Sequence, residues 1–209
     1  MWRVIKFLFF IISPFGIYIY GKEFLNLFLY QHAYTLPNVQ VFLTGLIPTS
    51  LLWFILGSKL TFFHVFEHEF THMIIGLLFF KKPRVFIASE YGGAVELYGG
   101  NFIITLAPYF FPTFSYLLLL IFPLLNPSFY NYFYLSLGII TGYHISSTLI
   151  EFDFRQPDII TSGIVFSLLF CLFMNILTLG FLFYFVAYGF KGGVEFLRIF
   201  EVYLQRFLT

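Results

Sequence analysis

The chain has 209 residues, of which 60% are hydrophobic and only 10% are charged, and its formal net charge is +1. Charged residues make up roughly 25% of a typical soluble domain, so this composition excludes an ordinary soluble fold. The near-zero net charge excludes a nucleic-acid partner, because no basic stripe is present to neutralise phosphates. The composition therefore favours a single domain, residues 1–209, embedded in a lipid bilayer.

Six apolar segments are predicted to span the membrane, because each approaches the roughly 20 residues that a spanning helix requires. They cover about residues 4–20, 41–57, 60–80, 102–125, 129–150 and 158–188. Pro14 and Gly16 predict a kink in the first segment, and three prolines predict a kinked or partly re-entrant fourth segment. The first segment lacks a small-x-small cleavage site, so we expect it to be retained.

Three other segments complete the predicted fold. Residues 22–39 have mixed character and are expected to form an interfacial connection, and residues 84–97 contain two β-prone runs around Gly92 and Gly93, which predict a hairpin. Residues 194–207, within a tail of residues 190–209, are amphipathic and expected to lie along the interface. The predicted fold class is an all-α polytopic membrane protein with about six transmembrane helices and a short β-hairpin after the third.

The distribution of Lys and Arg does not predict an orientation. Alternating loops between six spans carry nearly equal numbers of cations on the two sides, so the positive-inside rule does not choose between them. We expect an integral multi-pass protein of a bacterial cytoplasmic membrane, and nothing in the sequence determines its oligomeric state.

The third apolar segment contains the sequence HEFTH, which is an instance of HExxH. In a helix the i,i+4 spacing places His68 and His72 on one face, where they can bind one Zn²⁺ with Glu69 beside the metal-bound water. Charged groups at the bilayer centre cost roughly 2.5 to 3.5 kcal/mol each and persist mainly where they have a function. The cluster therefore indicates a metal site, with a structural polar network between helices as the alternative.

Neighbouring residues of the same segment are expected to support this site. His64 continues the row of histidines, but a third residue of the same row would lie one turn too far from the metal to bind it. We therefore expect His64 to contact a metal-binding side chain or to pack. Glu67 points away from that face and is expected to pair with a polar group on a neighbouring helix. Gly76 would let another helix or the substrate approach closely.

The third ligand must come from elsewhere in the chain, because a catalytic zinc needs three protein ligands. Asp158 follows Pro157 at a predicted helix start, where the backbone N–H groups fix the direction of a carboxylate. Asp153 is the competing ligand, and simple helix capping is the alternative role of Asp158. His144 and Asn101 are the candidate donors to an oxyanion, although His144 could instead bridge two helices. Outside the third apolar segment, the remaining candidate metal ligands are Glu90, Glu96 and Glu151. Cys171 is expected only to pack against other side chains.

These features together resemble the site-2 protease family of intramembrane zinc metalloproteases. The resemblance covers roughly residues 60–163 and rests on HExxH, the hairpin-like segment after it, the Leu106-Ala107-Pro108 motif and the distant Pro157-Asp158 pair. It implies that His68, His72 and Asp158 bind Zn²⁺ and that Glu69 is the catalytic acid/base. The chain departs from the family pattern in having Pro-Asp-Ile where Leu-Asp-Gly is usual, in lacking the usual glycine inside HExxH, and in having no inserted soluble domain.

The function expected from this resemblance is hydrolysis of peptide bonds in membrane-protein or peptide substrates. A transmembrane substrate would have to unwind locally, and pairing with an edge of the hairpin would replace its lost hydrogen bonds. Two other classes of function stay open. The chain could be an inactive relative that acts as a membrane scaffold or chaperone, or a metal- or haem-binding membrane protein that uses His68, His72 and His144.

Overall fold

The computed structural model describes residues 1–57 and 61–208 of the chain, so Leu60 at the start of the expected third segment lies outside the described residues. The helices are α1 (Trp2–Leu29), α2 (Pro37–Leu56), α3 (Thr61–Leu78), α4 (Phe102–Leu106), α5 (Thr113–Leu119), α6 (Tyr130–Glu151), α7 (Pro157–Ser162), α8 (Ile164–Leu197) and α9 (Ile199–Leu208). Short 3₁₀ turns lie at Ala33–Thr35, Ala107–Tyr109, Phe122–Leu124 and Pro127–Phe129. Strands β1 (Pro83–Ser89) and β2 (Gly92–Leu97) form an antiparallel hairpin.

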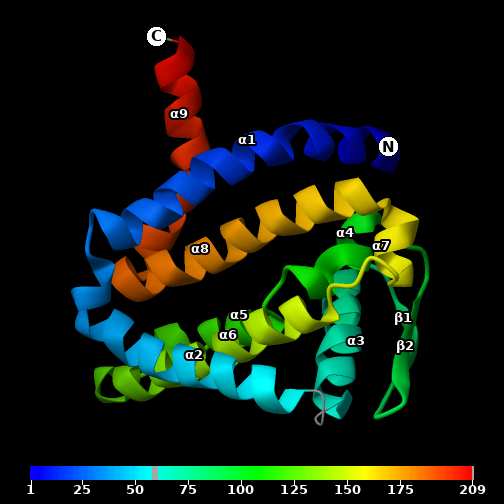
Figure 1. The fold of residues 1–209 in the computed structure, drawn as a ribbon, viewed down its shortest axis with the longest axis horizontal. Coiled ribbons are helices and arrows are strands. Elements are labelled where there is room, and N and C mark those ends of the chain that lie inside the picture. The colour runs from blue at the N-terminus through cyan, green and yellow to red at the C-terminus, as the bar shows by residue number, and fades with distance from the viewer. Residues whose placement is uncertain (58–60, 209) are drawn as a thin grey trace.

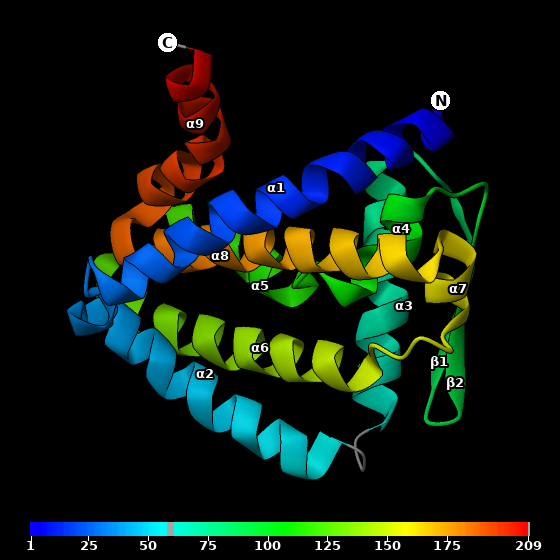
Figure 2. The ribbon, with the colours of Figure 1, turned by 45° about the horizontal axis from the view of Figure 1, so that its top comes forward.

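The long helices lie side by side, and α3 does not join them. In Figures 1 and 2, α1 packs along α8 and α2 packs along α6, whereas α3 and the hairpin run across one end of these helices. The N-terminus of α1, the C-terminus of α6 and the start of α8 lie at that same end. The HExxH helix is therefore placed where the long helices end.

Four described helices are long and apolar enough to cross a membrane: α1, α2, α6 with the 3₁₀ turn before it, and α8. The number rises to five if the bent pair of residues 102–109 and 113–124 counts as one span. Among the described residues, α3 does not meet this criterion, because the acidic and histidine side chains of the motif lower its hydropathy. The helical class and the hairpin are confirmed, while six spans remain a prediction.

Glycines bring α2 and α6 into close contact. A Cβ atom at Gly138 would lie 2.0 Å from the carbonyl oxygen of Phe42, and one at Gly142 would lie 2.4 Å from that of Leu46. The two glycines are four residues apart on α6, which is the small-xxx-small spacing that allows helix backbones to approach in a membrane. The hydroxyl of Ser146 also donates to the carbonyl of Ser50 across this contact, at 3.0 Å.

The structure changes the expected limits of several segments. Helix α1 passes through Pro14 and continues to Leu29, and α2 already begins at Pro37, so the connection expected over residues 22–39 is limited to residues 30–36. Its interfacial location stays a prediction. The fourth segment breaks as expected, with a bend of 89°.

The sixth segment is two helices rather than one. Gly163 separates α7 from α8 with a φ of 87°, a conformation that glycine adopts without steric cost. The backbone of α8 breaks at Gly189, with a φ of 72° and a ψ of −169°, so residues 190–197 form a separate helical piece at the start of the expected tail. Helix α9 projects away from the long helices (Figure 1). The interfacial location of this tail remains a prediction.

Candidate metal centre

Helix α3 presents the two histidines of the motif on one face, as their spacing predicts. The ring centroids of His68 and His72 are 4.9 Å apart. Gly76, one turn further along, receives Leu97 of β2, since a Cβ atom there would lie 2.6 Å from Leu97 Cδ1. The close approach expected at Gly76 is therefore made by the chain's own hairpin.

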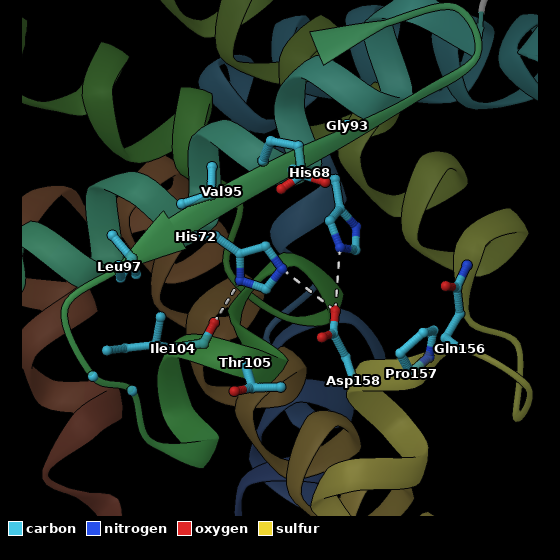
Figure 3. A pocket seen from close by; sticks show the side chains of 14 residues that line it. His68, His72, Gly93, Val95, Leu97, Ile104, Thr105, Gln156, Pro157 and Asp158 are labelled. Carbon is cyan, nitrogen blue, oxygen red and sulfur yellow. Dashed lines mark hydrogen bonds and ion pairs between the residues drawn. The ribbon is translucent and has the colours of Figure 1, made fainter. Parts of the chain in front are cut away.

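Asp158 completes a three-residue cluster with the histidines. Pro157 begins α7, so Asp158 lies in the first helical turn and its carboxylate projects toward α3 (Figure 3). Its Oδ2 atom lies 3.4 Å from Nε2 of His68 and 3.4 Å from Nε2 of His72. The ligand atoms of these three side chains all lie within 4.8 Å of one another, so the group could hold a metal ion.

The spacing of these atoms suits a tetrahedral metal. Zinc lies about 2.0 to 2.2 Å from nitrogen and oxygen ligands, so two ligand atoms of a tetrahedral site are about 3.4 Å apart. A charge-assisted hydrogen bond would instead bring nitrogen and oxygen to about 2.7 to 2.9 Å. The separations at Asp158 match the first arrangement.

The other ring nitrogens have acceptors that set the tautomers. Nδ1 of His72 lies 2.9 Å from the carbonyl oxygen of Ile104, and Nδ1 of His68 lies 3.4 Å from Oε2 of Glu151. A carbonyl or carboxylate oxygen can only accept, so each Nδ1 carries the proton. An ion bound beside Asp158 would then meet the lone pair of each Nε2, as metal ligation requires.

The Ile104 carbonyl is placed by Asn101, one of the two expected oxyanion donors. Asn101 is the N-cap of α4, and its Oδ1 atom accepts from the backbone N–H groups of Ile103 and Ile104 at 2.9 and 3.1 Å. Its side chain does not line either cavity beside the histidines. The structure therefore gives Asn101 a helix-capping contact.

Glu69 lies under the hairpin. A Cβ atom at Gly93 would be 2.5 Å from Cγ of Glu69 and 2.7 Å from Cγ1 of Val65, so only glycine allows β2 to lie this close to α3. The backbone of Val95 also contacts the Glu69 carboxylate. Figure 3 shows β2 passing directly beside the two histidines, which makes β2 the strand that borders the site.

Two cavities meet at the motif. The larger, of about 580 Å³, lies on the side of His72 and Asp158, and the smaller, of about 410 Å³, lies on the side of His64 and Glu151. The residues that line both are His68, Glu69, Gly93 and Gln156. A chain lying along β2 would therefore pass over Glu69 with a cavity on either side.

His144, the other expected oxyanion donor, is not brought to this site. Its Nδ1 atom lies 3.2 Å from Oε1 of Glu67, and its Nε2 atom lies 3.4 Å from the hydroxyl of Thr148. His144 is 2% exposed and Glu67 is 5% exposed, so the pair is sealed between α3 and α6. Glu67 thus has the partner on a neighbouring helix that we expected, and His144 makes the helix-bridging contact that was the alternative to catalysis.

Asp153, the competing ligand, also lies elsewhere. It accepts from the Nε atom of Arg155 at 3.0 Å and from the backbone N–H of the same residue at 2.8 Å. The hydrogen bonds from Arg155 lower the pKa of Asp153 to about 2, so its carboxylate stays ionised in this surface pair. Glu90 and Glu96 are exposed, and neither lines a cavity beside the histidines.

Two residues at the site were not assigned roles from the sequence. The hydroxyl of Tyr109 lies 3.5 Å from Oδ2 of Asp158, and its ring packs edge-on against His68 with centroids 5.3 Å apart. Glu151 was only one of several acidic candidates, although its place in the densest acidic segment was a signal. Tyr109 follows the Ala107-Pro108 pair, and one aromatic among many in this chain gives no such signal.

A scan against protein-family models, a search of curated proteins and a search of solved structures each found no match to this chain.

Proposed function

We propose that this chain is a zinc-dependent endopeptidase of a membrane, of the site-2 protease type. The observation that carries the proposal is the position of Asp158, whose Oδ2 atom is equally far from the Nε2 atoms of His68 and His72. Three ligands with an open fourth position are the pattern of catalytic zinc sites, whereas structural sites are closed by four protein ligands. The cavity beside the cluster provides the open side.

The metal would supply a Lewis acid that polarises the peptide carbonyl and favours ionisation of water. Glu69 is the residue that would take the proton from that water and later give it to the leaving amine. Its carboxylate follows His68 directly in the chain and faces the strand along which a substrate would lie. We assign the oxyanion donor to neither His144 nor Asn101, because neither lines the cavity.

The place of α3 favours substrates cut near a membrane boundary. If the long helices span a bilayer, the site lies at one of their ends, where a substrate segment leaving the lipid would meet it. Such a segment needs less unwinding than the middle of a transmembrane helix, because its peptide groups can already bond to water. We propose juxtamembrane segments of membrane proteins as the substrate class and a bacterial cytoplasmic membrane as the setting.

The hairpin offers one edge to an extended substrate. The N–H of Tyr98 bonds to the carbonyl of Lys82 on the β1 side, so alternation along β2 directs the N–H groups of Gly93, Val95 and Leu97 to the other edge. That edge borders the larger cavity. Pairing there would hold a substrate in the extended form that peptide hydrolysis requires.

The test uses the purified protein in phospholipid vesicles with a panel of single-span peptides that carry a quenched fluorophore at the juxtamembrane segment. Zinc-loaded wild type should cleave members of the panel, a chelator should abolish cleavage, and added zinc should restore it. Glu69→Gln should lose cleavage while retaining zinc, because the amide cannot take a proton from water. A zinc-loaded wild type that cleaves no peptide would instead favour the scaffold or chaperone class, and a Soret band would favour the haem class.

A further inference from the structure

Glu151 joins two histidines of α3 from the last residue of α6. Its Oε2 atom lies 3.4 Å from Nδ1 of His68, and its Oε1 atom lies 3.1 Å from Nδ1 of His64. The Nδ1 and Nε2 atoms of an imidazole lie on different edges of the ring, so Glu151 approaches His68 from the side away from Asp158. It cannot bind the same ion as Asp158 while it keeps this contact.

The carboxylate of Glu151 is held in place through its other oxygen. The hydroxyl of Ser147, one turn earlier on α6, donates to Oε1 at 3.2 Å, and His64 reaches the same oxygen from α3. The orientation of Glu151 is thus fixed by donors from two helices.

The protonation of His64 follows from its contact with α2. Nε1 of Trp53 lies 2.9 Å from Nε2 of His64, and an indole N–H can only donate, so this Nε2 accepts and Nδ1 carries the proton. The carbonyl of Gly57 lies 3.1 Å from the same Nε2, but the indole has no other way to bond and decides the tautomer. A chain of hydrogen bonds then runs from Trp53 to His64, from Nδ1 of His64 to the hydroxyl of Ser147 at 2.8 Å, and from that hydroxyl to Glu151.

We propose that Glu151 is a positioning residue of the metal centre, which accepts from Nδ1–H of His68 and fixes the orientation of its ring without contacting the metal. A carboxylate accepting from the far nitrogen of a ligating histidine also raises its basicity, and losing such a partner typically weakens metal binding roughly 10- to 100-fold. His72 has only the neutral carbonyl of Ile104 in this position. The metal-related part of this inference rests on the proposed function.

The experiment compares Glu151→Gln and Glu151→Ala with Glu96→Gln, which removes an exposed carboxylate that lines neither cavity. A glutamine side chain has only one acceptor oxygen, whereas Glu151 has two. In Glu151→Gln an N–H₂ group therefore faces either Nδ1–H of His68 or the donors His64 and Ser147. The first measurement is ¹H–¹⁵N NMR of imidazole-labelled, metal-free protein in micelles, which detects the Nδ1–H proton of His68, assigned by its loss in His68→Ala. The second is the zinc dissociation constant, measured by competition with a chromophoric chelator.

We expect wild type and Glu96→Gln to show a hydrogen-bonded Nδ1–H at His68, seen as a downfield and slowly exchanging proton signal, and the same zinc affinity. Glu151→Ala should lose this signal or move it upfield, and both Glu151 variants should weaken zinc binding by about 10- to 100-fold. In both variants, cobalt loaded in place of zinc should show a visible absorption band displaced from that of the wild type. An unchanged Nδ1–H signal with an unchanged zinc affinity in folded Glu151→Ala and Glu151→Gln would overturn the proposal.

Failure of the proposed function would look different. A wild type that binds zinc but cleaves no peptide contradicts the peptidase and leaves the test of Glu151 intact. A wild type that binds no zinc removes the metal-related part, and the NMR measurement still decides whether Glu151 accepts from the Nδ1–H of His68. Should Glu151→Ala not fold, Glu151→Gln provides the same two measurements with a side chain of nearly equal size.

Discussion

The carboxylate of Asp158 lies 3.4 Å from Nε2 of His68, although 90 positions of the chain separate the two residues. The contact joins the first turn of α7 to the middle of α3, and the loop that follows α6 brings them together. A separation of this size is long for a charge-assisted hydrogen bond and suits two ligands of one metal.

Asp158 and Asp153 make a matched pair of variants for testing the ligand set. Asp158→Asn should lose zinc, because an amide is a poor ligand and the third donor is gone, and His68→Ala and His72→Ala should do the same. Asp153→Asn should keep zinc, since its carboxylate is paired with Arg155 at the surface. Metal analysis of the purified proteins measures the outcome. Zinc retained in Asp158→Asn would contradict the role of Asp158 as a ligand. Zinc lost in Asp153→Asn would indicate that Asp153 is a ligand instead.

The free edge of β2 can be tested with proline. Leu97→Pro removes an N–H from the edge that borders the site and should leave the pairing with β1 in place, because that N–H points away from β1. Val95 is left unchanged, because its backbone bonds to the Glu69 carboxylate. We expect peptide cleavage to fall by about tenfold or more while zinc stays bound.

Ala88→Pro is the control for this edge. Ala88 pairs with Gly93 in the register and belongs to β1, none of whose residues lines a cavity beside the histidines, so a proline there removes an N–H from the edge away from those cavities. Cleavage should stay near the wild-type rate. Equal losses in both variants would mean that the hairpin acts as a whole rather than through the edge of β2.

Gly142 tests the contact between α2 and α6. Gly142→Leu places a side chain where even a Cβ atom would lie 2.4 Å from a backbone oxygen, so the two helices must separate. Overpacking of this kind costs about 1–3 kcal/mol of the free energy of unfolding, and thermal unfolding in detergent should occur at a lower temperature. Gly21→Ala is the control, because its Cβ atom would meet only Ile176 at an ordinary distance of 3.9 Å. A melting temperature unchanged in Gly142→Leu would contradict this packing.

The arrangement of the helices also predicts an orientation that six alternating spans did not. The segments at the site end in Figure 1 are the start of α1, the turn from α3 into β1 and the loop from α6 to α7, and their cations are Arg3, Lys6, Lys81, Lys82, Arg84 and Arg155. The segments at the opposite end are the last part of α1 and the junction of α8 with α9, and the cations there whose side chains the structure describes are Lys22, Lys191 and Arg198. Hydrogen bonds from Tyr20 to Leu197 and from Tyr184 to Glu23 hold that second group together. By the positive-inside rule the site end should face the cytoplasm.

Single cysteines can measure this orientation in cells. In a Cys171→Ala background, Tyr91→Cys at the hairpin tip and Tyr30→Cys after α1 place thiols at positions that are 100% and 77% exposed. A membrane-impermeant maleimide should label Tyr30→Cys in intact cells and Tyr91→Cys only after lysis. The reverse pattern would place the site on the outer side.

The sequence by itself determined the local parts of this protein. Its composition predicts apolar helices, the Gly-rich run between β-prone segments predicts the hairpin, and the i,i+4 spacing of HEFTH places His68 and His72 on one face. These features depend on backbone periodicity and on neighbours within a few residues, so they can be inferred before any packing is known.

The tertiary structure decided which distant groups meet. His144 pairs with Glu67 instead of lining the cavity. Asp153 pairs with Arg155, whereas Asp158 lies beside His68 and His72. The tertiary structure also lays α3 across the ends of the other helices, although apolar length had suggested another span. Each outcome depends on the angles and heights at which separate helices pack, which the backbone glycines of α6 and the breaks around α7 determine. Local periodicity contains no information about those relations.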